Sequence, residues 1–335
     1  MKNPHLGHVA IITGACGQDG RILGKKLIDH GIHVIGIVKD KNQEGVLHQY
    51  NPNVEIIVLD SHDRGVLKQI VLSKKPKYIY NLSAKSSVAN SWNAVTETME
   101  VNLMQTLNWL EVLRESNLLE TRFYQASSSE MFGIAIESPQ TEMTSFHPRS
   151  PYGVSKVSAH HLVVNYRESY GLHASSGILF NHESPLRNPN FLSRKISMNV
   201  ASIARKESDT FSVSSTEISR DWGWAPDYVD GMIKINSAPK PDDFVLATGV
   251  SHSISQFLKT AFEYVGIYNW EERVKIDDSQ QRPAEIMSLK GDSSKAKRIL
   301  DWEATTSFVE MVERMVQFDL DLIDGTARSP NWQCF

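Results

Sequence analysis

The chain has 335 residues, and two modest domains fit this length better than one large domain. Its 35 basic and 39 acidic residues nearly cancel, which argues against a nucleic-acid or anionic-membrane partner; any anionic ligand must therefore meet local arginines. The longest apolar runs are too short to cross a bilayer and no signal peptide is recognised, so we expect a soluble, cytosolic protein. The two cysteines, Cys16 and Cys334, lack metal-ligand spacing, and we predict no disulfide and no metal site.

A glycine-rich turn follows the first apolar run of the chain. Residues 9–12 are typical of a buried parallel strand, and a helical pattern begins after the turn. Gly14, Gly17 and Gly20 allow a tight turn, a close approach of the backbone to a pyrophosphate, and close packing of the helix on the strand. The next strand-like run, residues 33–38, lies where a dinucleotide fold requires it. We therefore interpret the turn as a cofactor-binding loop rather than an ordinary glycine turn.

Strand-like runs alternate with helical patterns through the first half of the chain. The runs cover residues 34–38, 54–59, 78–82, 123–127 and 174–180, and the main helical patterns cover residues 96–114 and 152–170. This alternation predicts an α/β protein with a Rossmann-type, doubly wound parallel sheet covered by helices on both faces. Ser150 as a cap and Pro151 in the first turn mark the start of the second helix.

The alternation fades after residue 180. Loops with several prolines follow, and helical patterns return at residues 253–264 and 308–322. We therefore predict a dinucleotide-binding domain over residues 1–180. A smaller, mainly substrate-binding domain is predicted over residues 181–335, with some of its segments returning to the first domain.

Acid, base and hydroxyl side chains gather near the middle of the chain. Tyr152 and Lys156 are four residues apart and share one face of a helix, where an ammonium can lower the phenol pKa and the tyrosine can act as a base toward a hydroxyl. Glu130 follows a run of three serines that includes Ser128, and it supplies a second acid or base. Each residue alone also suits a surface pair, a polar strand end or a cap. At these separations, after a dinucleotide loop, we interpret them as a site for redox chemistry on a sugar.

Further segments extend this pattern. They are TGACGQDG (13–20), FYQASSSEMFG (123–133), HPRSPYGVSK (147–156), NYRESYG (165–171), GILFNHESP (177–185), the Arg194-Lys195 pair, RDWGWAPDYV (220–229) and RPAE (282–285). Together they resemble the GDP-mannose 4,6-dehydratases, a group within the extended short-chain dehydrogenase/reductase family. The resemblance spans nearly the whole chain, and the NHESP and RDWG segments are more specific than the Tyr-Lys pair.

The resemblance implies a hydro-lyase that converts GDP-mannose to GDP-4-keto-6-deoxymannose. Tyr152, assisted by Lys156, would take the proton of the C4 hydroxyl while hydride leaves C4 for a nicotinamide. Glu130 would then take the C5 proton, water would leave from C6, and the hydride would return to C6. Ser128 stands where the family usually has Thr, and its hydroxyl would hydrogen-bond the C4 oxygen.

The resemblance also implies two sets of binding residues, and a homodimer or homotetramer. The cofactor set is Gly14, Gly17, Gln18, Asp19, Gly20, Lys39, Asp60, Leu82, Ser83, Tyr152, Lys156 and His182. The set for a GDP-sugar substrate is Ser87, Asn181, Glu183, Arg187, Arg194, Lys195, Arg220, Arg282 and Glu285. Guanidinium groups suit the diphosphate because they meet phosphate oxygens with two parallel bonds.

The end of the second strand departs from the family pattern. The family usually has two arginines there, suited to the 2′-phosphate of NADP, whereas this chain has Lys39 and Asp40. Lys39 can meet a phosphate, but Asp40 would repel one and accept from a free 2′-hydroxyl. We expect NADP, with NAD as the alternative. Residues 84–88 resemble the related GDP-4-keto-6-deoxymannose reductases instead, and residues 213–215 lack the usual GNL-like turn.

Three alternatives remain beside GDP-mannose dehydration. The same chemistry on a GDP-heptose is one. A GDP-4-keto-6-deoxy-sugar reductase or epimerase is another, and it would need Tyr152 and Lys156 but no C5 base, so Glu130 separates it from a dehydratase. The third is a noncatalytic nucleotide-binding protein, against which the complete set of acid and base residues argues.

Overall fold

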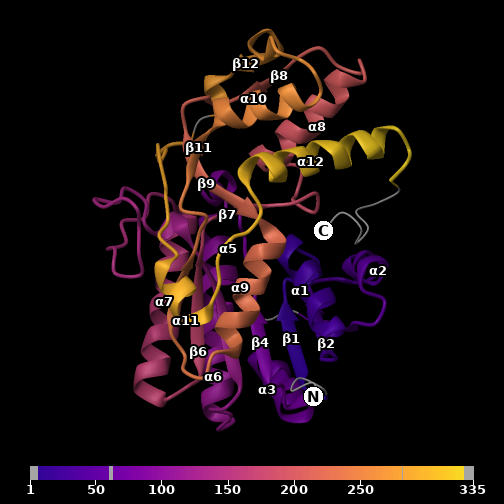
Figure 1. The fold of residues 1–335 in the computed structure, drawn as a ribbon. Coiled ribbons are helices and arrows are strands. Elements are labelled where there is room, and N and C mark those ends of the chain that lie inside the picture. Colours follow the sequence, from indigo (N-terminus) through magenta and orange to yellow (C-terminus); the bar gives the residue numbers. More distant parts are fainter. Residues whose placement is uncertain (1–6, 60–62, 281, 328–335) are drawn as a thin grey trace.

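The computed structural model describes residues 7–59, 63–280 and 282–327, and both Asp60 and Cys334 lie outside these ranges. The chain forms a larger part around a parallel sheet and a smaller part stacked on one end of it (Figure 1). Within the described ranges, no helix has the length and apolar character needed to span a membrane.

The larger part is built on a seven-stranded sheet whose neighbouring strands all run parallel. Its strands are β1 (Val9–Thr13), β2 (His33–Val38), β3 (Glu55–Val58), β4 (Tyr78–Asn81), β5 (Arg122–Ser128), β6 (Ala174–Leu179) and β10 (Asp243–Leu246). Their order is β3-β2-β1-β4-β5-β6-β10, so the chain winds outward from β1 first in one direction and then in the other. The central strands are almost wholly buried, and the apolar run of β1 is typical of a strand covered on both faces. The predicted doubly wound Rossmann-type sheet is confirmed.

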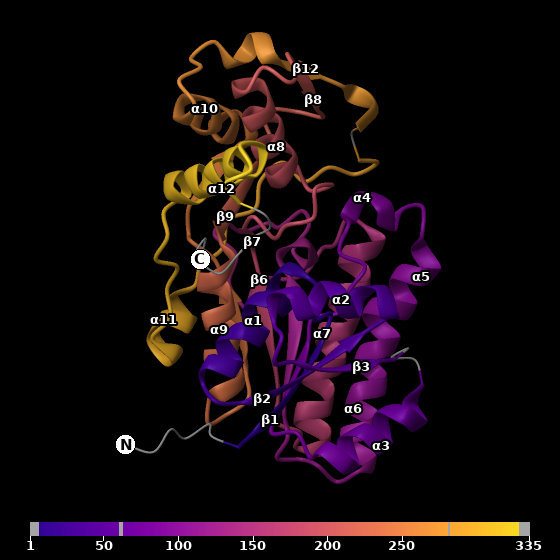
Figure 2. The same ribbon diagram turned by 90° about the vertical axis from the view of Figure 1, so that its right-hand side faces the viewer.

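Helices cover both faces of this sheet (Figure 2). One face carries α1 (Gln18–Asp29), α2 (Lys41–Tyr50) and α9 (Ala225–Ser237), and the other carries α3 (Arg64–Lys74), α6 (Gln105–Glu115) and α7 (Pro151–Tyr170). Separate apolar clusters fill the two interfaces, with Leu23 and Tyr228 in one and Trp109 and Val163 in the other. Ser150 caps α7 by accepting a hydrogen bond from the N–H of Gly153 at 3.0 Å, as the sequence predicts.

The helical pattern predicted over residues 96–114 is confirmed, but it contains a π-helical turn that the sequence did not reveal. The structure has α5 (Val95–Met99), a π-helical turn η1 (Glu100–Met104) and then α6. Within that turn, the buried Asn102 accepts a hydrogen bond from the backbone N–H of Lys85 at 2.8 Å and donates one to Oγ of Ser155 at 2.9 Å. A wider turn accommodates one extra residue without ending the apolar face, so the apolar spacing alone did not reveal it.

The smaller part has its own sheets and core. Its elements are β7 (Asn181–Glu183), β9 (Ser219–Trp224) and β11 (Ser251–Ser253) in one sheet, β8 (Phe211–Val213) and β12 (Val274–Ile276) in another, and helices α8 (Leu192–Ala204), α10 (Ile254–Tyr264) and α12 (Phe308–Ile323). The remaining short elements are α4 (Val88–Ser91), η2 (Ser129–Met131), η3 (Trp270–Arg273), η4 (Asp278–Gln280) and α11 (Ser294–Leu300). The second half of the chain also contributes to the larger part, because α9 and β10 belong to it and α11 packs against them.

Candidate active site

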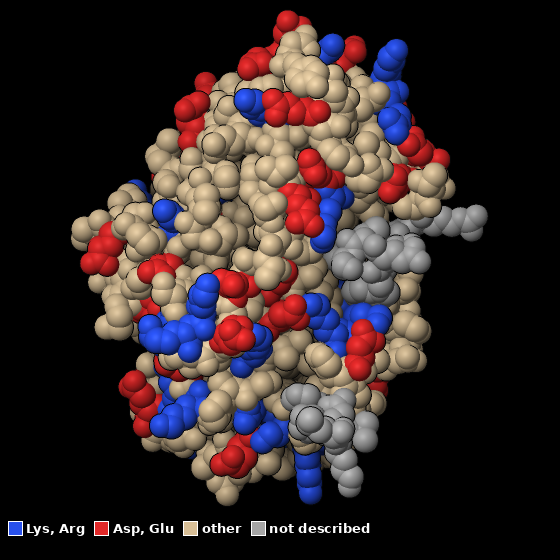
Figure 3. All heavy atoms as spheres, viewed as in Figure 1, with Lys and Arg blue, Asp and Glu red and all other residues tan. Residues whose placement is uncertain are grey.

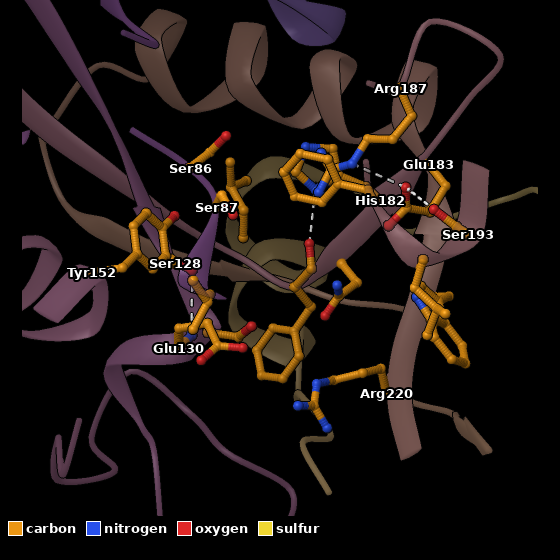
Figure 4. A pocket seen from close by; sticks show the side chains of 18 of the residues that line it. Ser86, Ser87, Ser128, Glu130, Tyr152, His182, Glu183, Arg187, Ser193 and Arg220 are labelled. Atoms are coloured by element: carbon orange, nitrogen blue, oxygen red, sulfur yellow. Dashed lines mark hydrogen bonds and ion pairs between the residues drawn. The ribbon is translucent and has the colours of Figure 1, made fainter. Parts of the chain in front are cut away.

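A cavity of about 350 Å³ lies where the carboxyl ends of the parallel strands face the smaller part. Open α/β sheets bind their ligands at this edge. Figure 4 shows Tyr152, Ser128 and Glu130 on one side of the cavity, and His182 and Glu183 across from them. The two sides come from different parts of the molecule, because β5, η2 and α7 supply the first group and β7 supplies the second.

Most of the predicted site residues line this cavity. They are Asp19, Leu82, Ser87, Ser128, Glu130, Tyr152, Lys156, Asn181, His182, Glu183, Arg187, Lys195, Arg220, Arg282 and Glu285. The predicted residues Gly14, Gly17, Gln18, Gly20, Lys39 and Ser83 do not line it. The glycines form the turn next to Asp19, and Ser83 lies against Gly14. The predicted contact of Asp60 falls outside the described residues.

Arg194, also predicted to bind the substrate, does not line the cavity. Its side chain is buried, forms an ion pair with Asp319 of α12, and lies 5.5 Å from the centre of the Phe318 ring. The next residue, Lys195, lines the cavity instead. Neighbouring residues of an α-helix point in directions about 100° apart, so only one member of the Arg194-Lys195 pair can face the cavity.

The glycine turn fits a dinucleotide. Gly14 has φ of +66°, and an added Cβ would lie 2.9 Å from backbone atoms of Leu82 and Ser83. A Cβ on Gly20 would overlap the carbonyl oxygen of Gly14. Gly17 is the N-cap residue of α1 and offers no side chain to the first N–H groups of the helix. Those groups therefore suit an anionic pyrophosphate, as helix N-termini generally do.

His182 of β7 contacts Asp19 of α1. Its Nδ1 lies 2.7 Å from the carbonyl oxygen of Phe180 and its Nε2 lies 3.0 Å from Oδ2 of Asp19. Both neighbours are acceptors, so the ring satisfies both contacts only as an imidazolium. Burial lowers the pKa of His182, but the charge and hydrogen bond of Asp19 outweigh burial and raise it. Gln18 adds to this junction, because its Nε2 donates to the His182 carbonyl at 3.0 Å and its Oε1 accepts from Ser184 at 2.8 Å.

Burial shifts the pKa values of both Tyr152 and Lys156. It raises the pKa of Tyr152 to about 12, and a hydrogen bond with Ser128 opposes this only in part. It lowers the pKa of Lys156 to about 8. Nζ of Lys156 donates to the carbonyl oxygen of Ala126 at 2.8 Å and lies 5.8 Å from the centre of the Tyr152 ring. The expected lowering of the phenol pKa by Lys156 is therefore not found, because burial dominates and the ammonium is held by a carbonyl.

Several cationic side chains line the cavity. Lys195, Arg220 and Arg282 all line it. Arg220 is buried, and its Nη1 donates to the carbonyl oxygen of Ile286 at 2.8 Å. On the outer face seen in Figure 3, side chains of both signs are interspersed. A group of cations inside a cavity of a protein with net charge −4 is suited to a phosphorylated ligand.

Glu183 and Arg187 contact each other beside His182. Nε of Arg187 lies 3.2 Å from Oε2 of Glu183, and the same oxygen accepts a hydrogen bond from Ser193 at 2.7 Å. Glu183 is only 2 % exposed. The Glu183 carboxylate therefore holds Arg187 and, through Ser193, the start of α8 at the wall of the cavity.

The sequence interpretation missed several residues that line the cavity. They include Ser86, Ser127, Asn190, Phe191, Leu192, Ser193, Ser214, Ile218, Trp222 and Ile254. Residues 190–193 follow the NHESP segment and include the first two residues of α8, and this position after a strand was the available signal. Apolar residues such as Ile218 and Ile254 carry no such signal, because the same side chains also fit an ordinary core.

Comparisons with known proteins agree with this geometry. The family model described as GDP-mannose 4,6 dehydratase matches residues 11–315. The Arabidopsis thaliana protein GDP-mannose 4,6 dehydratase 1 is 42 % identical over 327 residues, covering 94 % of this chain and 90 % of the relative. The human GDP-mannose 4,6 dehydratase is 40 % identical over 343 residues, covering 94 % and 92 %.

Solved structures support the fold. UDP-glucose 4-epimerase of Thermotoga maritima, with UDP-glucose, matches with a TM-score of 0.83 at 22 % identity over 94 % of this chain and 99 % of the other. The dTDP-glucose 4,6-dehydratase of Bacillus anthracis, in complex with NAD, matches with a TM-score of 0.81 at 17 % identity over 93 % and 96 %. At these identities the likeness concerns the fold alone.

Proposed function

This chain belongs to the GDP-mannose 4,6-dehydratase family, and from that membership we propose that it converts GDP-mannose to GDP-4-keto-6-deoxymannose and water. The observation that carries the proposal is the joint placement of Tyr152, Ser128 and Glu130 in a single cavity that cationic groups also line. A hydroxyl base and a second carboxylate base are what a 4,6-dehydration needs, and a diphosphate needs the cations.

The first half of the reaction uses the residues around Tyr152. A bound nicotinamide nucleotide supplies the hydride chemistry, accepting hydride from C4 of the sugar and returning it to C6. Tyr152 takes the proton of the C4 hydroxyl, and Ser128 hydrogen-bonds the same oxygen. Because burial raises the pKa of Tyr152 to about 12, the developing phenolate needs a positive charge nearby. Lys156, one helical turn further along α7, provides it.

The second half of the reaction uses Glu130. Once C4 is a ketone, the C5 proton is acidic and Glu130 takes it. The same carboxyl group returns this proton to the C6 oxygen as the C6–O bond breaks, so water leaves. The proton that Tyr152 took from the C4 hydroxyl finally returns to C5, which balances the reaction.

The cationic side chains of the cavity position the nucleotide. Lys195, Arg220 and Arg282 bind the diphosphate, and Glu285 accepts from ribose hydroxyls or orients the arginines. Glu285 already accepts from Nη2 of Arg220 at 3.3 Å and from the N–H of Ile286 at 3.2 Å. Contacts remote from the reacting carbons fix the sugar against the bases, and such positioning supplies much of the rate.

NADP is the proposed cofactor. Asp40 is the N-cap residue of α2, and its Oδ1 accepts from the N–H of Asn42 at 2.9 Å and of Gln43 at 3.3 Å. A carboxylate engaged with the helix backbone is a poor partner for a ribose hydroxyl. Lys39 precedes it, directly after β2, where a 2′-phosphate is expected to lie.

The activity is tested with purified protein, a catalytic amount of NADP and GDP-mannose labelled with deuterium at C4. We expect a product lighter by one water, deuterium at C6, and no net reduction of the nucleotide. Stoichiometric reduced nucleotide would indicate a simple dehydrogenase, and a C4 epimer without water loss would indicate an epimerase. The same assay with a GDP-heptose separates the two sugar classes.

A further inference from the structure

Arg282 lies between two carboxylates. Its Nη1 is 3.7 Å from Oε1 of Glu130 and 3.7 Å from Oε1 of Glu285. Both contacts are ion pairs, and both are longer than a hydrogen bond. The guanidinium therefore attracts the two carboxylates through its charge and donates no hydrogen bond across these two contacts.

The two oxygens of Glu130 have different surroundings. Oε1 faces Arg282, whereas Oε2 is buried and has no hydrogen-bond partner among the described residues. The Glu130 side chain is only 12 % exposed. Leaving a carboxylate oxygen buried without a donor costs free energy, so such an atom calls for an explanation, and a catalytic role is one.

Glu285 is fixed more firmly than Arg282. Its Oε1 accepts from its neighbour's backbone, the N–H of Ile286, and from Arg220, which is itself anchored on the carbonyl oxygens of Ser219 at 2.9 Å and Ile286 at 2.8 Å. Arg282 is 30 % exposed and is drawn toward this anchored carboxylate from one side and toward Glu130 from the other. Arg282 thus links the Glu130 carboxylate to the anchored Glu285 carboxylate through two ion pairs.

We propose that Arg282 is a positioning residue for the C5 base, an inference that rests on the proposed function. Its charge holds the Glu130 carboxylate at the wall of the cavity, where the carboxylate takes the proton. In that step the C5–H bond breaks, the proton forms an O–H bond with the carboxylate, and the electron pair moves into the enolate of the C4 ketone. The other N–H groups of Arg282 remain for the diphosphate, because a guanidinium has five donors.

The test compares the rate of C4 oxidation, which forms the 4-keto intermediate, with the rates of C5 exchange and water loss, which consume it. Wild-type protein, Arg282→Gln and Arg282→Lys, each loaded with NADP, react with GDP-mannose in deuterium oxide. Absorbance of the reduced nucleotide reports C4 oxidation, and mass spectrometry reports C5 exchange and water loss. In Arg282→Gln we expect C5 exchange and water loss to slow at least about tenfold relative to C4 oxidation, within the range that misplacing a catalytic group produces. Arg282→Lys retains the charge and should recover most of that loss.

Lys195→Gln is the matched control. Lys195 also lines the cavity, but it projects from α8 rather than from the RPAE segment that carries Arg282. This variant should bind GDP more weakly, yet its ratio of C5 exchange to C4 oxidation should equal that of the wild type. If Arg282→Gln also only weakens GDP binding, with the wild-type ratio of C5 exchange to C4 oxidation, Arg282 acts on the diphosphate alone and the proposal is overturned. The ratio is measured on bound substrate, so partial unfolding of a variant does not alter it. A wild type that loses no water would instead contradict the proposed function itself.

Discussion

Tyr152, Lys156 and Glu130 lie within one cavity but have different environments. Burial raises the pKa of Tyr152 to about 12 and lowers that of Lys156 to about 8. Oε1 of Glu130 forms an ion pair with Arg282, and the buried Oε2 has no hydrogen-bond partner within the described part of the chain. The phenol therefore depends on its neighbours to lose a proton, whereas the carboxylate has an oxygen that no hydrogen bond engages. This difference suits Tyr152 to a hydroxyl that is being oxidised and Glu130 to a carbon acid.

Replacing Glu130 by Gln tests the division of roles at the residue scale. Glu130→Gln keeps the shape of the side chain but removes the base, so C4 oxidation should persist. C5 exchange and water loss should fall by at least about a hundredfold, the usual scale for removing a general base. Deuterium exchange at C5 and accumulation of reduced nucleotide report the two steps. Dehydration at the wild-type rate would show that another group takes the C5 proton.

At the scale of elements, the contact between α1 and β7 should be sensitive to pH. His182 has a raised pKa and Asp19 a lowered one, because their mutual charge and hydrogen bond outweigh the burial of each. The pair is fully formed below the ordinary histidine value of 6.5 and above the ordinary aspartate value of 3.8. Its contribution is lost as pH rises through the raised pKa of His182, and as pH falls through the lowered pKa of Asp19.

Chemical unfolding of wild type and Asp19→Asn at several pH values checks this expectation. The wild type should be more stable by about 2 kcal/mol in the window between these two values, as a charge-assisted hydrogen bond gives. The difference should shrink as the medium becomes alkaline. A difference that is constant from acid to alkaline pH would mean that the imidazolium is not formed.

The start of α2 gives a second prediction for an element. Asp40→Ala removes the cap of α2, and the free energy of unfolding should fall by about 1 kcal/mol. Its preference for NADP over NAD should be unchanged, because the carboxylate is engaged with the helix. Lys39→Ala should lose a preference for NADP of about 1 kcal/mol. Binding constants of both nucleotides decide the matter, and tighter NAD than NADP binding in the wild type, weakened in Asp40→Ala, would overturn the cofactor proposal.

At the scale of the whole molecule, the smaller part depends on a buried charge pair. Arg194 of α8 and Asp319 of α12 are 6 % and 4 % exposed. Removing one member leaves the other buried and uncompensated, so Arg194→Ala should lower the free energy of unfolding by about 3 to 5 kcal/mol. The KM of the remaining folded enzyme for GDP-mannose should change little.

Lys195→Ala provides the opposite case at the next position. It should raise KM for GDP-mannose and leave the unfolding midpoint nearly unchanged, because Lys195 lines the cavity. Thermal unfolding and steady-state kinetics of the two variants together make the comparison. If Arg194→Ala raised KM with unchanged stability, Arg194 would have to reach the substrate.

The spacing of residues along the chain was enough to predict the sheet and the central acid and base groups of this protein. The order of strand, glycine turn and helix, the alternation over residues 9–180, and the separation of Ser128, Glu130, Tyr152 and Lys156 are properties of neighbouring residues, and the sequence alone predicted the sheet and the central acid and base groups from them. Which member of the Arg194-Lys195 pair faces the cavity was decided by the tertiary structure, because the choice depends on Asp319 in a distant helix. The same holds for the pKa of Tyr152, the charge of His182 and the contact of Arg282 with Glu130. Burial and charge pairing arise between residues far apart in the chain, and no local pattern records them.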